Sequence, residues 1–447
     1  MKPFSKNVQP GRSYLIIFGF AWSFVVVIGH LKALVGLNPF PMLGTLIISI
    51  WLTGFFGGVL VSSNSGKPIL APAQRSLLPP SGAFMDLLIF GMFVFAFIGH
   101  FVWNRYAADT SGMSLAEVRS NRLATMETSR PTAVNYLFYL ADLSLYLGVI
   151  GCVALKLKRL TRVGCGLVFM VIAVVIFRKT GSRFPFISIF SLIAASYLIF
   201  HAELIFRKLR SHVAAAVLLV ILMFSVNSIL NIIRFEGGAQ GREAGLYEVK
   251  GGFILEKFGV IDTISPLNAA FGLLDEYTGN VVNYFESYVT ENNLDPQNGR
   301  FLFRFIFQRF GAFDWFEIKA ASDDVLYAIG ITYNVWCTGL REIWVDFGWA
   351  TLATGPLLGI AVTRAYRKRH VSSGSGVLAA LLCAWLLFSP FTSIHKNIGF
   401  ELGLYAGLVI MVVERICGRS LLDFTSGGTF LNYTDQPRFK SVYSKTK

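Results

Sequence analysis

Residues 83–103 read AFMDLLIFGMFVFAFIGHFVW, an apolar run interrupted by one acidic residue, Asp86. A helix needs about 20 apolar residues to cross a hydrocarbon layer roughly 30 Å thick. This stretch is long enough, so it predicts a transmembrane helix. Further stretches of the same kind occur along the chain, and together they decide the fold class.

The composition of the whole chain agrees with a membrane location. Of the 447 residues, 54% are hydrophobic and only 15% are charged, whereas a soluble domain is about 25% charged. The formal net charge is +14, but the basic residues form short clusters between apolar runs rather than one patch suited to a nucleic acid. The sequence therefore predicts an all-α polytopic membrane protein. Its expected partner is the lipid bilayer, and no nucleic acid is expected to bind.

About ten segments are long and apolar enough to span. The fifth is the weakest because Arg162 interrupts it, so it either spans with its end charges at the interfaces or does not span. The segments centre on residues 14–36, 39–61, 83–103, 133–155, 160–177, 186–206, 213–233, 340–363, 377–394 and 398–416.

Lys and Arg in short loops predict the orientation, because cytoplasmic loops retain positive charge. With a cytoplasmic N-terminus, the inside segments are basic, and omitting the fifth span would move two of them outside. The charge bias thus favours ten spans over nine, with the first apolar stretch retained as a helix rather than removed as a signal peptide. The inside segments are 1–13, 62–82, 156–159, 207–212 and 364–376.

The predicted organisation has four parts. Residues 1–234 form a membrane region of about seven helices, 235–339 a large periplasmic loop, 340–416 a membrane region of about three helices, and 417–447 a cytoplasmic polar tail. The loop has fourteen Asp and Glu against seven Lys and Arg, so its charge is opposite to that of the whole chain. Residues 281–289 predict one of its helices, with an apolar face of Val281, Val282, Phe285, Tyr288 and Val289. Residues 301–313 lie either flat at the membrane interface or packed within the loop.

Known motifs for nucleotides and metals are absent from the sequence, which disfavours an ATP-driven pump or a metalloenzyme. Cys152, Cys165 and Cys383 lie within apolar runs, so we expect packing residues and no disulfide framework. The unusual feature is the cluster Arg178–Arg183, which the topology places outside at the start of the sixth helix. Two arginines and free backbone N–H groups there suit a diphosphate, although arginines at a helix end also extend to lipid headgroups.

A second outside cluster starts the eighth segment. Arg341 and Glu342 follow Thr338-Gly339-Leu340, and Asp346 falls one turn later in an otherwise apolar run. Glu342 and Asp346 can each neutralise Arg341 as ordinary neighbours. Ionisable residues are costly within a membrane, which makes this group a candidate functional site.

Here the chain resembles the Wzy-type O-antigen polymerases, bacterial oligosaccharide repeat-unit polymerases. Residues 333–348, YNVWCTGLREIWVDFG, are similar to the family's Asn-Val, Leu-Arg and Asp-Phe-Gly segment. Gly181-Ser182-Arg183 is similar to its Gly-Ser-Arg before a helix, and Tyr277-Thr278-Gly279 resembles its Tyr-x-Thr-Gly region, without the Gly-rich continuation common there. With the late outer loop, the resemblance covers most of residues 14–416.

The resemblance implies an inner-membrane glycosyltransferase, similar in plan to GT-C-type enzymes, and the charge bias of the loops predicts that both termini are cytoplasmic. Its substrate would be an undecaprenyl-diphosphate-linked oligosaccharide, with no cofactor, and a chain-length regulator and a flippase of the same pathway as partners. Arg183 and Arg341 would stabilise the departing diphosphate, with Glu342 and Asp346 as candidate bases. Expected substrate contacts are Arg178, Tyr277, Thr278, Gly279, Arg304 and Asn334.

Two other functions remain open at this stage, an O-antigen ligase and a flippase without enzymatic activity. Related ligases use a histidine in the outer loop, and residues 235–339 contain none, which favours the polymerase. A flippase would ordinarily lack a soluble loop of this size, which favours a site at the outer surface.

Overall fold

The computed structural model describes residues 13–37, 39–64, 82–106, 133–180, 184–201, 280–290, 338–391 and 397–417, together with 296, 299 and 302. All regular structure in this part of the chain is helical, with no strand. The helices are α1 (Ser13–Leu34), α2 (Met42–Asn64), α3 (Ala83–Tyr106), α5 (Ala133–Ala154), α6 (Arg159–Thr180), α7 (Phe184–Phe200), α13 (Val281–Thr290), α16 (Leu340–Phe347), η2 (Gly348–Ala350, 3-10), α17 (Thr351–Lys368), α18 (Ser373–Phe388) and α19 (Ile398–Cys417).

The apolar segments predicted from the sequence form helices wherever the structure describes them. Six helical stretches of the described residues are long and apolar enough to cross a membrane. They include the doubtful fifth segment, α6, whose 22 residues are continuous, and residues 340–368, which α16, η2 and α17 make up together. The predicted segment 213–233 lies outside the described residues. The prediction of one helix over 340–363 is wrong, because α16 ends at Phe347 and η2 separates it from α17.

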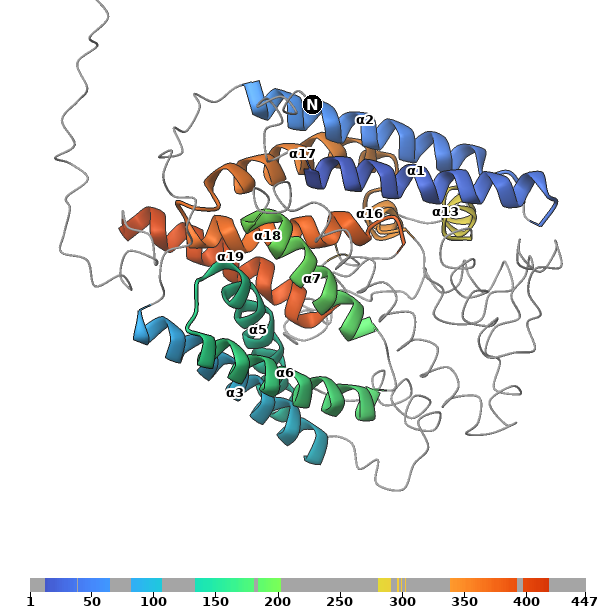
Figure 1. The fold of residues 1–447 in the computed structure, drawn as a ribbon. Helices are drawn as coiled ribbons and strands as arrows, with labels where there is room; N and C mark the ends of the chain where they lie inside the picture. Colours follow the sequence, from blue (N-terminus) through green and yellow to red (C-terminus); the bar gives the residue numbers. More distant parts are fainter. Residues whose placement is uncertain are drawn as a thin grey trace, which may run out of the picture.

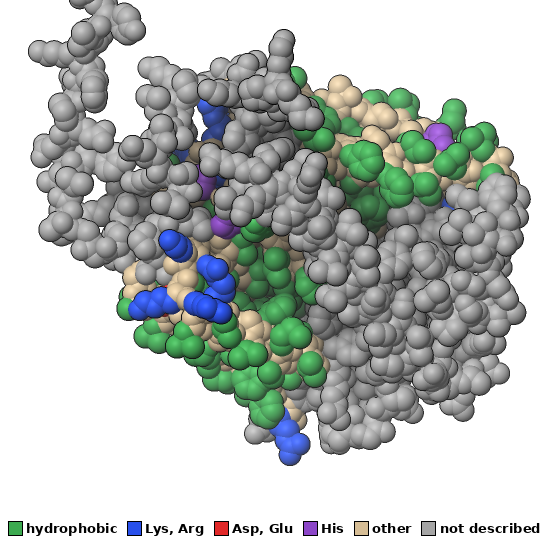
Figure 2. Space-filling model, in the orientation of Figure 1, with side chains coloured by type: hydrophobic (Ala, Val, Ile, Leu, Met, Phe, Trp, Pro, Cys, Tyr) green, Lys and Arg blue, Asp and Glu red, His purple; other side chains and the backbone are tan. Residues whose placement is uncertain are grey.

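The outer surface of the long helices is apolar, as a bilayer requires. Large hydrophobic side chains project from them unburied, for example Phe20 on α1, Leu87 on α3 and Leu167 on α6. Figure 2 shows this hydrophobic surface over the described helices, with basic side chains concentrated at one end. A soluble monomer rarely exposes so continuous an apolar surface, so the chain is a membrane protein.

Hydrogen bonds between helix ends define two ends of the bundle. At the first, Arg367 donates to the carbonyl of Ser62 over 2.8 Å, and Arg369 donates to the carbonyl of Ile199 over 2.9 Å. These contacts join the C-terminal ends of α2, α7 and α17, which we call the basic end. At the opposite end α13 lies across the last turn of α1 and the first turn of α2 (Figure 1). We call this the loop end.

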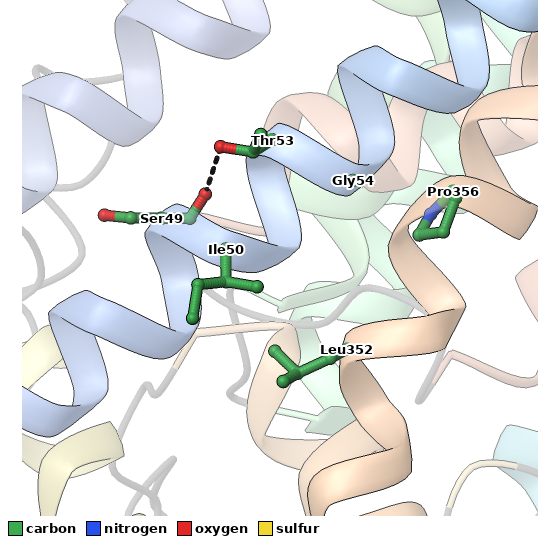
Figure 3. A pocket seen from close by; sticks show the side chains of 6 residues that line it. All are labelled: Ser49, Ile50, Thr53, Gly54, Leu352 and Pro356. Atoms are coloured by element: carbon green, nitrogen blue, oxygen red, sulfur yellow. Dashed lines mark hydrogen bonds between the residues drawn. The ribbon is translucent and has the colours of Figure 1, made fainter.

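Small residues bring α2 and α17 into close contact. Gly355 and Gly359, four residues apart on α17, face the backbone of Trp51 and Phe55 so closely that a Cβ at either position would collide with it. Such Gly-xxx-Gly spacing is typical of packed transmembrane helices. Beside this contact a groove opens between α2 and α17, lined by Ser49, Ile50, Thr53, Gly54, Leu352 and Pro356 (Figure 3).

Candidate functional site

The short helix α16 is the centre of the candidate site. It begins after Gly339, whose N–H donates to the carbonyl of Ser389 over 2.6 Å, and it ends at Gly348, where φ is 50° and ψ is −129°. That conformation strongly favours glycine. Figure 1 shows that α16 does not continue the line of α17. Residues 340–368 therefore form a broken helix. A membrane protein tolerates such a break only where protein or water covers the backbone.

Arg341 and Glu342 form an ion pair at the start of α16. Arg341 Nη2 lies 2.6 Å from Glu342 Oε1, and the two residues are 5% and 1% exposed. The guanidinium also lies over the ring of Tyr288, 5.6 Å from its centroid, within the usual range of a cation–π contact. A carboxylate and an aromatic face together hold this cation in a buried place at the loop end.

Asp346 has a different position. Its Oδ2 atom accepts a hydrogen bond of 2.6 Å from the backbone N–H of Leu302, and the side chain is fully buried. Pro296 lies close to Gly348 at the same end of α16. Asp346 thus ties a segment of the predicted outer loop to the end of α16.

The loop helix α13 covers this group. The predicted apolar face of Val281, Val282, Phe285, Tyr288 and Val289 is confirmed, because all five are buried. The ring of Phe285 meets Trp344 of α16 edge to face, with centroids 6.3 Å apart. The loop segment therefore packs on α16 rather than standing apart from the membrane helices.

Polar contacts attach α13 to the first two helices as well. Lys32 Nζ, in the last turn of α1, donates to Asn280 Oδ1 over 3.0 Å. The carboxylate of Glu286 accepts from the N–H groups of Leu43, over 3.2 Å, and of Gly44. Both N–H groups belong to the first turn of α2, where a helix lacks internal acceptors. Glu286 therefore caps α2 from the loop.

The buried Lys32 was missed from the sequence. Its contact Asn280 lies two turns before Tyr288, so Lys32 and Arg341 approach the same face of α13, about 12 Å apart along its axis. Tyr284 lies between them on this face, and its hydroxyl is 3.5 Å from Asn280 Nδ2. The available signal was a lysine at the end of the first span that the loop charges predict to be outside, the same anomaly that singled out Arg178–Arg183.

A second buried polar group was also missed. His100 Nε2 of α3 lies 3.5 Å from Asp142 Oδ1 of α5, and Asp142 Oδ2 accepts from Gly399 N at the start of α19 over 3.0 Å. Nearby, Tyr146 donates to Ser188 over 2.6 Å. The sequence held a signal for this group as well, because His100 and Asp142 are ionisable residues inside apolar runs.

The structure brings together Arg341, Glu342 and Asp346, three of the ten residues expected from the sequence. Arg178 lies in the last turn of α6, but its side chain is not described. The remaining six lie outside the described residues: Arg183, Tyr277, Thr278, Gly279, Arg304 and Asn334.

The described residues contain no group of three His, Cys, Asp or Glu side chains that could hold a metal ion. The described side chains at the loop end offer cations, carboxylates and aromatic rings. No protein-family model, curated protein or solved structure was found to match the chain.

Proposed function

We propose that the chain is a membrane glycosyltransferase of GT-C-like plan that polymerises undecaprenyl-diphosphate-linked oligosaccharide repeat units. The observation that supports this most directly is the buried Arg341–Glu342 pair on the broken helix α16, covered by α13. A cation held in place where negative charge develops favours the transition state over the ground state. The pair lies at the loop end, where such lipid-linked substrates would present their headgroups.

In the proposed reaction, a sugar hydroxyl of the incoming lipid-linked unit attacks the anomeric carbon of the growing chain. The new carbon–oxygen bond forms as the bond from that carbon to the diphosphate oxygen breaks. The diphosphate leaves with the bonding electron pair and is stabilised by Arg341, and the hydroxyl proton passes to Glu342. Arg183, outside the described residues, is proposed as a second cation for the diphosphate.

The ion pair fits both proposed roles. While Glu342 neutralises Arg341, the buried group has no net charge, which lowers the cost of placing it at the edge of the membrane. When a diphosphate binds the guanidinium instead, the carboxylate of Glu342 is released beside the reacting groups. Asp346, which holds Leu302, would keep the loop in position over the site.

Polysaccharide analysis in a strain that lacks the gene tests the function. A polymerase deletion should leave single repeat units on the lipid A core. Loss of a ligase would instead leave long polymer unattached to the core, and loss of a flippase would leave neither product. Normal polymer ladders in the deletion strain would contradict the proposal.

A further inference from the structure

The structure holds a strongly basic surface at the end where α6 begins, far from the proposed site. Lys156, Lys158, Arg159 and Arg162 are all exposed. Figure 2 shows basic side chains gathered on this part of the molecule, with no acidic side chain visible beside them on this face. We call these four residues the α6 basic patch.

The backbone beneath the patch is well fixed. In the connection between α5 and α6, Leu155 and Leu157 are buried while Lys156 and Lys158 are exposed, so the lysines project outward in alternation. The N–H of Lys158 also lies 3.4 Å from Asp86 Oδ1 of α3. Because the backbone is anchored, the four charges are held close together. Binding of a ligand therefore costs little conformational entropy of the backbone.

The patch continues directly into a lipid-facing surface. Below Arg159 and Arg162, α6 exposes Val163, Leu167 and Met170, which are 52%, 65% and 63% exposed. A Cβ built at Gly166 would meet no atom within 4 Å, so the middle of this face is open. The surface thus combines cations at a helix end with an apolar strip along the helix. An anionic phospholipid is complementary to it, because its headgroup is negative and its acyl chains are apolar.

We propose that the α6 basic patch binds the phosphate headgroup of an anionic phospholipid, whose acyl chains lie along the exposed face of α6. The negative headgroup would meet the four exposed cations, and the acyl chains would lie against the apolar strip of Val163, Leu167 and Met170. Basic residues next to a membrane helix each favour an anionic surface enough to change affinity about fivefold.

Titration of the purified full chain with phosphatidylglycerol in a neutral detergent, followed by native mass spectrometry, tests the proposal. The pair Lys156→Gln and Lys158→Gln, or the pair Arg159→Gln and Arg162→Gln, should each weaken binding about 25-fold. The charge-conserving pair Lys156→Arg and Lys158→Arg should bind as the wild type does. Arg105→Gln, at the opposite end of α3, is the matched control and should also leave binding unchanged.

Phosphatidylcholine provides the second control, since its headgroup has no net charge. Its binding should be equal in all variants. Unchanged phosphatidylglycerol binding in both glutamine pairs would overturn the proposal, as would an equal loss of phosphatidylcholine. Equal competition by soluble glycerol phosphate would show that the patch recognises a free phosphate rather than a lipid.

Discussion

Arg341 and Glu342 are adjacent in the chain, yet Arg341 Nη2 and Glu342 Oε1 lie 2.6 Å apart. Neighbouring residues of a helix point about 100° away from each other and do not ordinarily pair. The guanidinium nevertheless reaches its neighbour's carboxylate while lying over the ring of Tyr288. This arrangement presents the cation to α13 and places its carboxylate beside it.

Arg341→Ala should reduce polymer formation on the order of 100-fold or more, because the departing diphosphate loses its donor. Arg341→Lys should recover little, since a point charge does not reproduce the two-pronged guanidinium. Polymerisation of a purified lipid-linked repeat unit by the reconstituted chain measures both. Membrane insertion and thermal unfolding are checked in parallel, and a well-folded Arg341→Ala variant with full activity would contradict the assignment.

Glu342→Gln keeps the shape of the side chain but removes the charge and the base. We expect a loss of turnover together with loss of the acidic limb in the pH profile, because the proton acceptor no longer titrates. A merely structural role for Glu342 would reduce activity by the same factor at every pH. The pH dependence of turnover in the two proteins separates these outcomes.

Gly348→Ala should destabilise the fold by about 1–3 kcal/mol, because φ is 50° at this break between α16 and η2. Gly166→Ala is the control, since Gly166 lies in α6 with open space around it and alanine favours helix there. Thermal unfolding in detergent measures both. Equal melting temperatures for the two variants would argue against strain at the break.

Gly359→Leu should weaken the packing of α17 on α2 and lower the melting temperature, because its side chain would meet the backbone of Phe55. Overpacking of this kind typically costs about 1–3 kcal/mol. Gly57→Leu is matched to it, as Gly57 on α2 has no atom near the added Cβ. Similar melting temperatures for both leucine variants would contradict the close contact.

Asp142→Ala should destabilise the chain more than Asp142→Asn. Alanine removes the hydrogen bond that joins α5 to the start of α19 and leaves the Gly399 N–H with Asn397 Oδ1 as its acceptor, and a lost hydrogen bond costs about 0.5–1.5 kcal/mol. Asparagine retains a carbonyl oxygen for the same bond. The difference in thermal unfolding between the two variants measures this contribution, and a more stable alanine variant would refute it.

The sequence predicted the helices well because apolar length alone identifies a span. It located α1, α2, α3, α5 and α6 and the buried face of α13 within a few residues. The break at Gly348 was not predicted, since residues 340–363 are apolar enough on average to read as one span despite Arg341, Glu342 and Asp346. The interruption depends on a glycine conformation and on Asp346 holding Leu302. Lys32 was missed for a related reason: its contact with Asn280 joins residues 248 positions apart, which no local pattern reveals.

The capping of α2 by Glu286 has a consequence for biosynthesis. The first turn of α2 emerges from the ribosome more than 240 residues before its carboxylate acceptor, so until then water or headgroups must satisfy those N–H groups. The first helical hairpin can enter the bilayer early, but the end of it that meets α13 acquires its final bonding only after much of the protein has been translated. Insertion and maturation of this hairpin are therefore separate stages.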